Sequence, residues 1–259
     1  MRSIAFVLVG LLALLTGCAT VQPLRPPADA DASIHAVVAD RLPTIREKYV
    51  VTDIPHSYFG VGRSLKSISF LDAMFEVGSG PVAIGNRERI GDENHDRAVR
   101  VARVASTDLG VILKSLVSHS SERPQYVLVP AAVFAFDNDD VYTLRCIVNA
   151  DYDSGKGKPW HARYSVPAEG QFDLRDQDSS ARAVAALQPC MVEAYRLFRE
   201  HVTRTDGTYT TRTVHADIDF RMPVQDAALP TRIIGNDVLG LFEFRRSDVK
   251  SLEMPAGSK

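Results

Sequence analysis

The sequence predicts an α+β fold: a small mixed or antiparallel sheet in the order β-α-β-β-β-α, with helices packed on one face and a C-terminal β extension. Two observations predict this fold. Three apolar runs follow one another between residues 126 and 166 with short polar turns between them, as the strands of a meander do. Residues 96–116 and 179–202, on either side of these runs, place apolar residues three and four positions apart, which gives a helix one apolar face.

Composition and charge exclude several classes of protein. Of the 259 residues, 45% are hydrophobic and 24% are charged, as in ordinary globular proteins. The formal net charge of −2 leaves no excess of positive charge to attract a phosphate backbone, so we expect no nucleic-acid partner. The three cysteines show no Cys-x-x-Cys spacing, which argues against zinc ribbons and thioredoxin-type redox sites.

The N-terminus carries the most specific signal. Residues 4–15 are an apolar run behind Arg2, too short to cross a bilayer of about 30 Å but typical of a signal peptide. The run ends in Leu15-Thr16-Gly17-Cys18, which resembles the lipobox of bacterial lipoproteins, where the cysteine becomes the acylated first residue. In that family an Asp after the cysteine tends to retain the protein in the inner membrane. Because Ala19 follows here, the resemblance implies a lipid anchor in the outer membrane and a periplasm-facing body.

The chain divides into five parts by composition and hydrophobic pattern. They are a signal peptide over 1–18, a Pro/Ala-rich tether over 19–32, an N-terminal helical segment over 33–64, an α+β domain over 65–202 and a C-terminal β extension over 203–259. The tether has no hydrophobic period, so we expect a semi-extended linker. At about 3.1 Å per residue it would hold the domain about 40 Å from the membrane.

The first half of the chain has weaker patterns. Ile34, Val37 and Val38 begin the spacing that predicts the N-terminal helical segment. Residues 65–77 predict a strand, and the glycines between 78 and 91 predict a long surface loop.

The elements from residue 96 onward are better defined. Asp96 is expected to cap the helix over 96–116. Strands are predicted over 126–136, 141–152 and 160–166, and their alternation gives the meander one apolar and one wetter face. The helix over 179–202 should cover the apolar face through Val184, Leu187, Met191, Ala194, Tyr195 and Phe198.

Two prolines and the C-terminal pattern complete the expectations. Pro130 predicts an edge or a bulge in its strand, and Pro189 predicts a kink in the covering helix. Residues 214–222 alternate as one strand, and residues 238–244 as another that follows a turn at 235–237.

Four segments carry a resemblance to a known family: Tyr126-Val-Leu-Val, Asp151-Tyr-Asp, Trp160-His-Ala-Arg-Tyr-Ser-Val and Ala181-Arg-Ala-Val-Ala-Ala-Leu. With the lipobox, they make residues 65–202 resemble the YajG-like and ABC-transport-auxiliary lipoproteins, related in shape to the N-terminal domain of TolB. Cys190 and the C-terminal extension depart from that pattern. The resemblance supplies no catalytic residues and implies a partner-binding component of the cell envelope.

Two cysteines could form a disulfide. Cys146 lies on the apolar side of its predicted strand and Cys190 near the apolar face of the covering helix, so packing could bring them together. An oxidising periplasm would then bond them, which is worth on the order of 4 kcal/mol for a loop of this length. Two separately buried thiols are the alternative.

Candidates for metal binding and catalysis are weak. His215, Asp217 and Asp219 would share one side of a predicted strand in steps of about 6.8 Å, which is more often the wet side of a strand than a metal site. Ser247 and Lys250 match the Ser-x-x-Lys spacing of some hydrolases, but the companion motifs are absent. We therefore expect no metal and no other cofactor.

The sequence thus predicts a non-enzymatic outer-membrane lipoprotein, attached to the membrane by its N-terminal lipid. Its α+β domain is expected to bind an envelope protein partner from a transport, assembly or wall-associated complex. An envelope hydrolase or metal-dependent enzyme, and a lipoprotein that only tethers envelope layers, are the alternatives. The sequence predicts neither the partner nor the oligomeric state.

Overall fold

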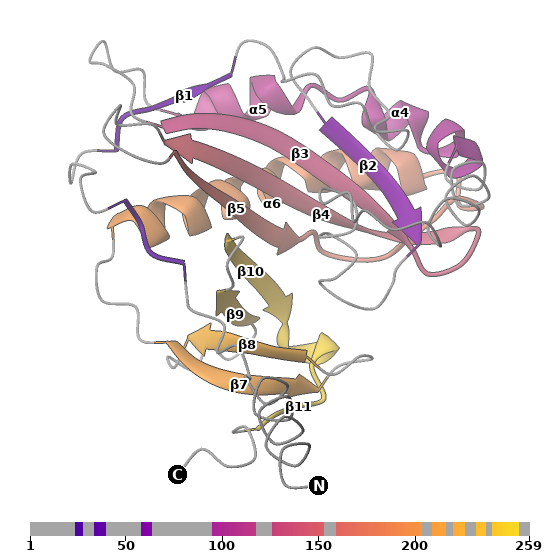
Figure 1. The fold of residues 1–259 in the computed structure, drawn as a ribbon. Helices are drawn as coiled ribbons and strands as arrows, with labels where there is room; N and C mark the ends of the chain where they lie inside the picture. The colour runs from indigo at the N-terminus through magenta and orange to yellow at the C-terminus, as the bar shows by residue number, and fades with distance from the viewer. Residues whose placement is uncertain are drawn as a thin grey trace, which may run out of the picture.

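The computed structural model describes residues 24–27, 34–39, 58–63, 95–117, 126–152, 159–203, 209–215, 220–225, 232–236 and 240–253. They form an α+β fold with helices packed on a mixed, open sheet, which confirms the predicted fold class (Figure 1).

The strands are β1 (Ala36–Val38), β2 (Tyr58–Arg63), β3 (Tyr126–Phe136), β4 (Val141–Tyr152), β5 (Trp160–Pro167), β6 (Phe172–Asp173), β7 (Tyr209–His215), β8 (Phe220–Gln225), β9 (Arg232–Asn236), β10 (Gly240–Arg245) and β11 (Ser251–Glu253). The helices are α4 (Ala102–Ala105), α5 (Leu109–Leu116), α6 (Ser179–Thr203) and the 3₁₀ helix η1 (Arg246–Asp248). Residues 95–100 are also helical.

The antiparallel meander β3-β4-β5 is the centre of the sheet, as predicted. β3 pairs with β4 without interruption from Tyr126 opposite Tyr152 to Phe136 opposite Tyr142. β5 pairs with the other edge of β4, and β6 continues that edge. Side chains at even positions of β4 are fully buried on one face of the sheet, among them Leu144, Cys146 and Val148.

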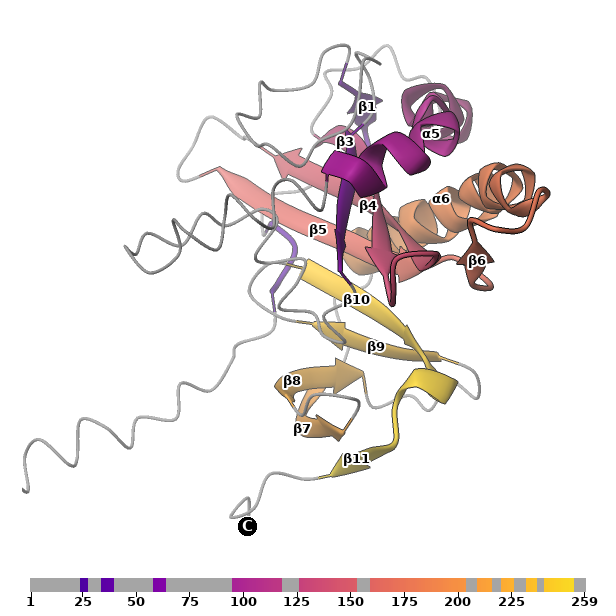
Figure 2. The ribbon, with the colours of Figure 1, turned by 90° about the vertical axis from the view of Figure 1, so that its right-hand side faces the viewer.

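Helices α5 and α6 cover that face (Figure 2). Leu187, Met191 and Phe198 are completely buried, so α6 packs on the meander by the predicted side. Val184 is 36% exposed and lies outside this contact, contrary to the prediction. Pro189 lies inside α6, which continues as one helix from Ser179 to Thr203.

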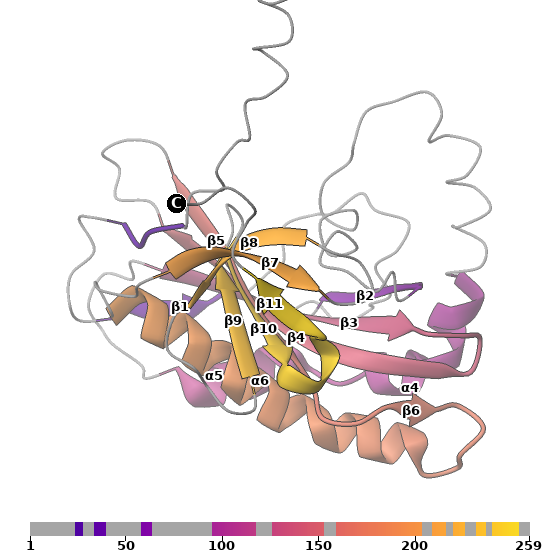
Figure 3. The same ribbon diagram turned by 90° about the horizontal axis from the view of Figure 1, so that it is seen from below.

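The opposite face of the meander is not left to solvent. Val129, Val133 and Ile147 are buried in a second cluster with side chains of the C-terminal strands. Figure 3 shows these strands in front of the central sheet. The C-terminal part was expected to be an appendage, but it covers the second face because β3 is apolar on both sides.

The C-terminal strands also continue the same sheet. β10 pairs in parallel with β5, and the order then runs β9, β8, β7 and β11. Gly240 makes this junction possible: its φ is +150°, and a Cβ built there would lie 1.9 Å from the backbone oxygen of Arg163. Only a residue without a side chain allows β10 to approach β5 this closely.

The N-terminal segment corrects a prediction. Residues 36–38 and 58–63 are strands that pair in parallel with β3, whereas a helical segment was expected over 33–64. Ala36 and Val38 are buried and Val37 is 37% exposed, so the pattern has the period of a strand. The rest of that helical segment, the strand over 65–77 and the loop over 78–91 lie outside the described residues.

Pro130 lies inside the sheet, in neither an edge strand nor a bulge. The backbone N–H of Tyr126 donates to the oxygen of His35, and that of Ala39 donates to the oxygen of Leu128. Even positions of β3 therefore direct their backbone groups toward β1 and β2. Pro130 falls between the stretches that pair with these two strands, so its missing N–H costs no bond in the ladder.

The predicted helix over 96–116 is interrupted. Helical structure over 95–100 includes Asp96, which is therefore not a cap. The chain leaves the helix after α4 and starts again at α5, where the Asp108 carboxylate accepts a hydrogen bond from the N–H of Val111 at 3.1 Å. Asp favours this cap over a helix interior, which explains the break.

The predicted strand over 214–222 is wrong. β7 and β8 are an antiparallel hairpin in which Val214 lies opposite Phe220. The chain therefore reverses within residues that alternate without a Gly or Pro, and alternation alone cannot separate one strand from two.

Candidate functional site

Part of the predicted tether lies against the folded domain. Residues 24–27, which we call the docked segment, are held by side chains of the domain body, so this part is not the free linker that the sequence predicts. Leu24 packs against the main apolar cluster. In Figure 1 the docked segment is the indigo trace below the C-terminal end of α6.

Three side chains bind the backbone of the docked segment. Asn236 accepts a hydrogen bond from the N–H of Leu24 at 2.9 Å and donates to the oxygen of the same residue at 3.1 Å. Nε2 of His201 also lies 3.1 Å from that oxygen. The indole N–H of Trp160 donates to the oxygen of Arg25 at 2.9 Å. Polar atoms of three consecutive peptide groups are thus bound, through the backbone of the two residues Leu24 and Arg25.

The docking site, by which we mean Trp160, Tyr164, His201 and Asn236, is assembled by the tertiary fold. Trp160 begins β5, His201 lies in the last turn of α6, and Asn236 ends β9. The predicted turn at 235–237 is therefore wrong for Asn236, which is a strand residue. The bonded residues are 135 to 212 positions apart in the chain.

Asn236 has the strictest need for hydrogen-bond partners in the site, because it is fully buried. A buried amide needs partners for both its oxygen and its nitrogen. The N–H and C=O of Leu24 supply one partner for each. The side chain therefore matches the backbone edge of an extended segment.

Proline explains why the docked segment is suited to this contact. Pro26 restricts Arg25 to extended conformations, because the proline ring clashes with a helical residue before it. Segments of this kind leave their carbonyls unpaired. An aromatic groove with a donor that reaches such a carbonyl is a recurring way to bind proline-rich peptides.

His201 is held as a neutral imidazole. The oxygen of Leu24 can only accept, so Nε2 carries the proton, and Nδ1 accepts from the Tyr164 hydroxyl at 2.8 Å. The side chain is 6% exposed. Burial lowers the pKa of His201 to about 4, although the bond to Leu24 acts in the opposite direction.

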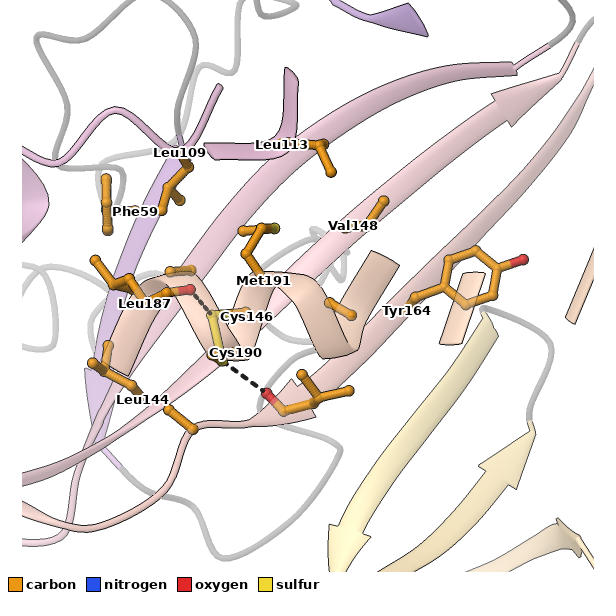
Figure 4. Close-up of a cluster of buried hydrophobic side chains, with 14 of the residues drawn as sticks. Phe59, Leu109, Leu113, Leu144, Cys146, Val148, Tyr164, Leu187, Cys190 and Met191 are labelled. Carbon is orange, nitrogen blue, oxygen red and sulfur yellow. Dashed lines mark hydrogen bonds between the residues drawn. A yellow bond between two sulfur atoms is a disulfide. The ribbon is translucent and has the colours of Figure 1, made fainter. Parts of the chain in front are cut away.

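Cys146 and Cys190 form a disulfide between β4 and α6 (Figure 4). Their Cα atoms are 5.7 Å apart, within the usual range for such a bond. Of the two alternatives considered from the sequence, the structure contains the bonded one. Both residues lie in the main core, where the bond ties the covering helix to the sheet.

Of the three weak metal candidates, the structure describes His215 alone. His215 is the last residue of β7, opposite Ser251 of β11, and Asp217 and Asp219 lie outside the described residues, as does Cys18. Among the side chains that the structure describes, no group of three or more His, Cys, Asp or Glu is arranged to hold a metal ion.

Ser247 and Lys250 are not one α-helical turn apart. Ser247 lies in η1, which ends at Asp248, and Val249 is extended with φ −113° and ψ 117°. Val249 is also buried, whereas its neighbours Ser247 and Lys250 are exposed. The helical geometry in which a Lys deprotonates a Ser is therefore absent at this motif.

Sequence reasoning missed the docking site. It placed Trp160 at the start of a strand with no binding role, Asn236 in a turn and residues 24–27 in a free tether. The available signal was Leu24, a large apolar residue between the prolines Pro23 and Pro26. That signal identifies a segment that can dock but not the surface that receives it.

Comparisons with protein-family models, with curated proteins and with solved structures found no match to this chain. Over the described ranges, no helix has the length and apolar character needed to span a bilayer.

Proposed function

We propose that this protein is a lipid-anchored lipoprotein of the outer membrane that faces the periplasm and acts, without catalysis, by binding an envelope protein partner. The observation that carries the proposal is the docking of an extended, proline-flanked segment immediately after the lipobox. The side chains of the docking site bind peptide backbone, which is the chemistry of protein recognition.

The position of the docked segment limits the distance between the domain and the membrane. Leu24 follows Cys18 by six residues. At no more than about 3.6 Å per residue, Leu24 would lie within about 20 Å of an acylated Cys18. The body would then be held about half as far from the lipid as a free tether allows, with the docking site on its membrane-proximal side.

The disulfide supports the proposed compartment. Disulfides persist in oxidising compartments such as the periplasm and are rare in the cytosol. The Cys146–Cys190 bond lies in the main core and is therefore part of the packed structure.

The anchor is tested by Cys18→Ser. We expect the variant to keep its signal peptide and to lack lipid, because cleavage follows acylation in the family that the lipobox resembles. Intact mass and membrane fractionation measure both. A variant that is cleaved after Gly17 and fractionates like the parent would refute the anchor.

Ala19→Asp is the matched variant for sorting. The resemblance implies that it is acylated and cleaved normally but moves from the outer to the inner membrane fraction. Unchanged fractionation would contradict the outer-membrane assignment and leave the anchor itself intact.

The partner is tested by cross-linking in the native host, followed by purification from a detergent extract. One envelope protein should co-purify reproducibly with the parent chain. The Cys18→Ser variant controls for proteins that bind only because both are in the same membrane. Failure to recover any protein reproducibly would count against partner binding.

A further inference from the structure

We propose that the docking site is a receptor for extended, proline-flanked peptide segments supplied by another protein, and that the docked segment is its resident, exchangeable occupant. The inference deepens the partner-binding part of the proposed function, on which it rests, by giving the partner a surface and a chemistry. It does not depend on the lipid anchor.

The hydrogen bonds of the site involve only backbone atoms of the occupant. Asn236 binds the backbone N–H and C=O of Leu24, and His201 binds the same C=O. Trp160 binds the backbone carbonyl of Arg25, and Arg25 is an exposed residue. The site therefore does not select the residue at the position of Arg25. The site requires three consecutive positions: an apolar residue, then a residue of any kind, and then a proline that keeps the segment extended.

The receiving side chains belong to the folded body. Trp160 contacts the buried ring of Tyr126 edge to face, with ring centroids 6.1 Å apart. The Tyr164 hydroxyl orients His201, and both of these residues are buried. Because the body orients its binding groups, an incoming segment would meet a site that is already formed, which reduces the entropy lost on binding.

An empty site is unfavourable, which favours exchange over simple release. Without an occupant, the amide of Asn236 and the Nε2 proton of His201 lose the partners that Leu24 provides. Release alone would leave water as the only partner of these groups, whereas a second peptide of the same chemistry restores every bond. The tether then acts as a competitor whose effective concentration is in the millimolar range.

The chain contains its own reporter for this exchange. Trp160 is the only tryptophan, and its indole nitrogen binds the occupant. Its fluorescence should therefore differ between the occupied and the empty site.

The test uses the full chain with the occupant disabled by Pro23→Gly, Leu24→Ser, Arg25→Gly, Pro26→Ser and Pro27→Gly. A synthetic peptide with the sequence of residues 21–30 is titrated into this variant and into the parent, and Trp160 fluorescence and heat are recorded. The variant should bind the peptide saturably. The parent should bind it at least about tenfold more weakly, because its tether competes.

One altered peptide and two variants of the site address specificity. A peptide in which the residues matching Leu24 and Pro26 are replaced by Asp and Gly should bind at least about tenfold more weakly than the parent peptide. In the disabled variant, Trp160→Phe keeps an aromatic ring but loses one donor, and should weaken binding about threefold to tenfold when heat is measured. Asn236→Leu has a similar volume and should abolish binding. Circular dichroism shows whether each variant is folded. If Asn236→Leu does not fold, the binding measured for Trp160→Phe decides.

The outcomes separate this inference from the lipid anchor. No saturable binding to the disabled variant at millimolar peptide overturns the receptor. Equal affinity of parent and disabled variant overturns the role of the docked segment as occupant. Equal binding of the control peptide overturns the stated chemistry. None of these results depends on Cys18, whose variant tests the anchor separately.

Discussion

Acidification should destabilise the protein through His201. In the folded state the imidazole is buried, with Nδ1 accepting from Tyr164 and Nε2 donating to the oxygen of Leu24. Its pKa is lowered from 6.5 to about 4 by burial. Between these values the unfolded chain binds a proton that the folded chain does not, so the free energy of unfolding falls as the pH is lowered.

The magnitude follows from the difference of 6.5 − 4 = 2.5 pKa units. At about 1.4 kcal/mol per unit, His201 contributes roughly 3 kcal/mol that is present above pH 6.5 and lost on reaching pH 4. Below that pH both states bind the proton and the contribution changes no further. Between about pH 7 and about pH 4.5 the loss should be roughly 2 kcal/mol.

Urea unfolding at these two pH values, followed by circular dichroism, measures the effect. His201→Gln removes the titration, so its stability should fall by roughly 2 kcal/mol less than that of the parent. His161→Gln, at a side chain that is 67% exposed, is the matched control for the replacement of a histidine by glutamine. Equal losses in the parent and His201→Gln would refute the argument from burial.

Three further predictions concern packing. Phe198→Ala removes a fully buried ring and should cost about 3–5 kcal/mol in urea unfolding, whereas Arg199→Ala, on an exposed position of the same helix, should change stability by less than about 0.5 kcal/mol. Equal effects would mean that α6 does not pack by this face. Replacing Cys146 and Cys190 together by Ala should lower stability by roughly 4 kcal/mol, since the bond closes a separation of 44 residues, and a reductant should then have no further effect. Gly240→Ala should cost more than about 2 kcal/mol in the same assay, because a side chain there meets backbone of β5 at positive φ; a smaller change would indicate that β10 does not approach β5 so closely.

Local pattern was enough for the central elements. Strands β3, β4 and β5 and helix α6 were predicted nearly to their observed ends, because each has a strong period and clear polar turns beside it. The same pattern placed Cys146 on the apolar side of its strand and Cys190 near the apolar face of the helix, which is why a disulfide was one of two alternatives. Short elements were less predictable: three residues of β1 carry too little periodicity to exclude a helix.

The sequence by itself determined the class of fold, the central meander and its covering helix, since these depend on which face of each element is apolar. Only the tertiary structure decided that the C-terminal strands close the second face of the sheet and that residues 24–27 dock at Trp160, His201 and Asn236. The physical reason is that the second face is closed by apolar side chains from separate parts of the chain, and that the docking contacts join backbone groups to side chains more than a hundred residues away. Such hydrogen bonds leave no periodic trace in the chain, and they exist only once β5, α6 and β9 have come together.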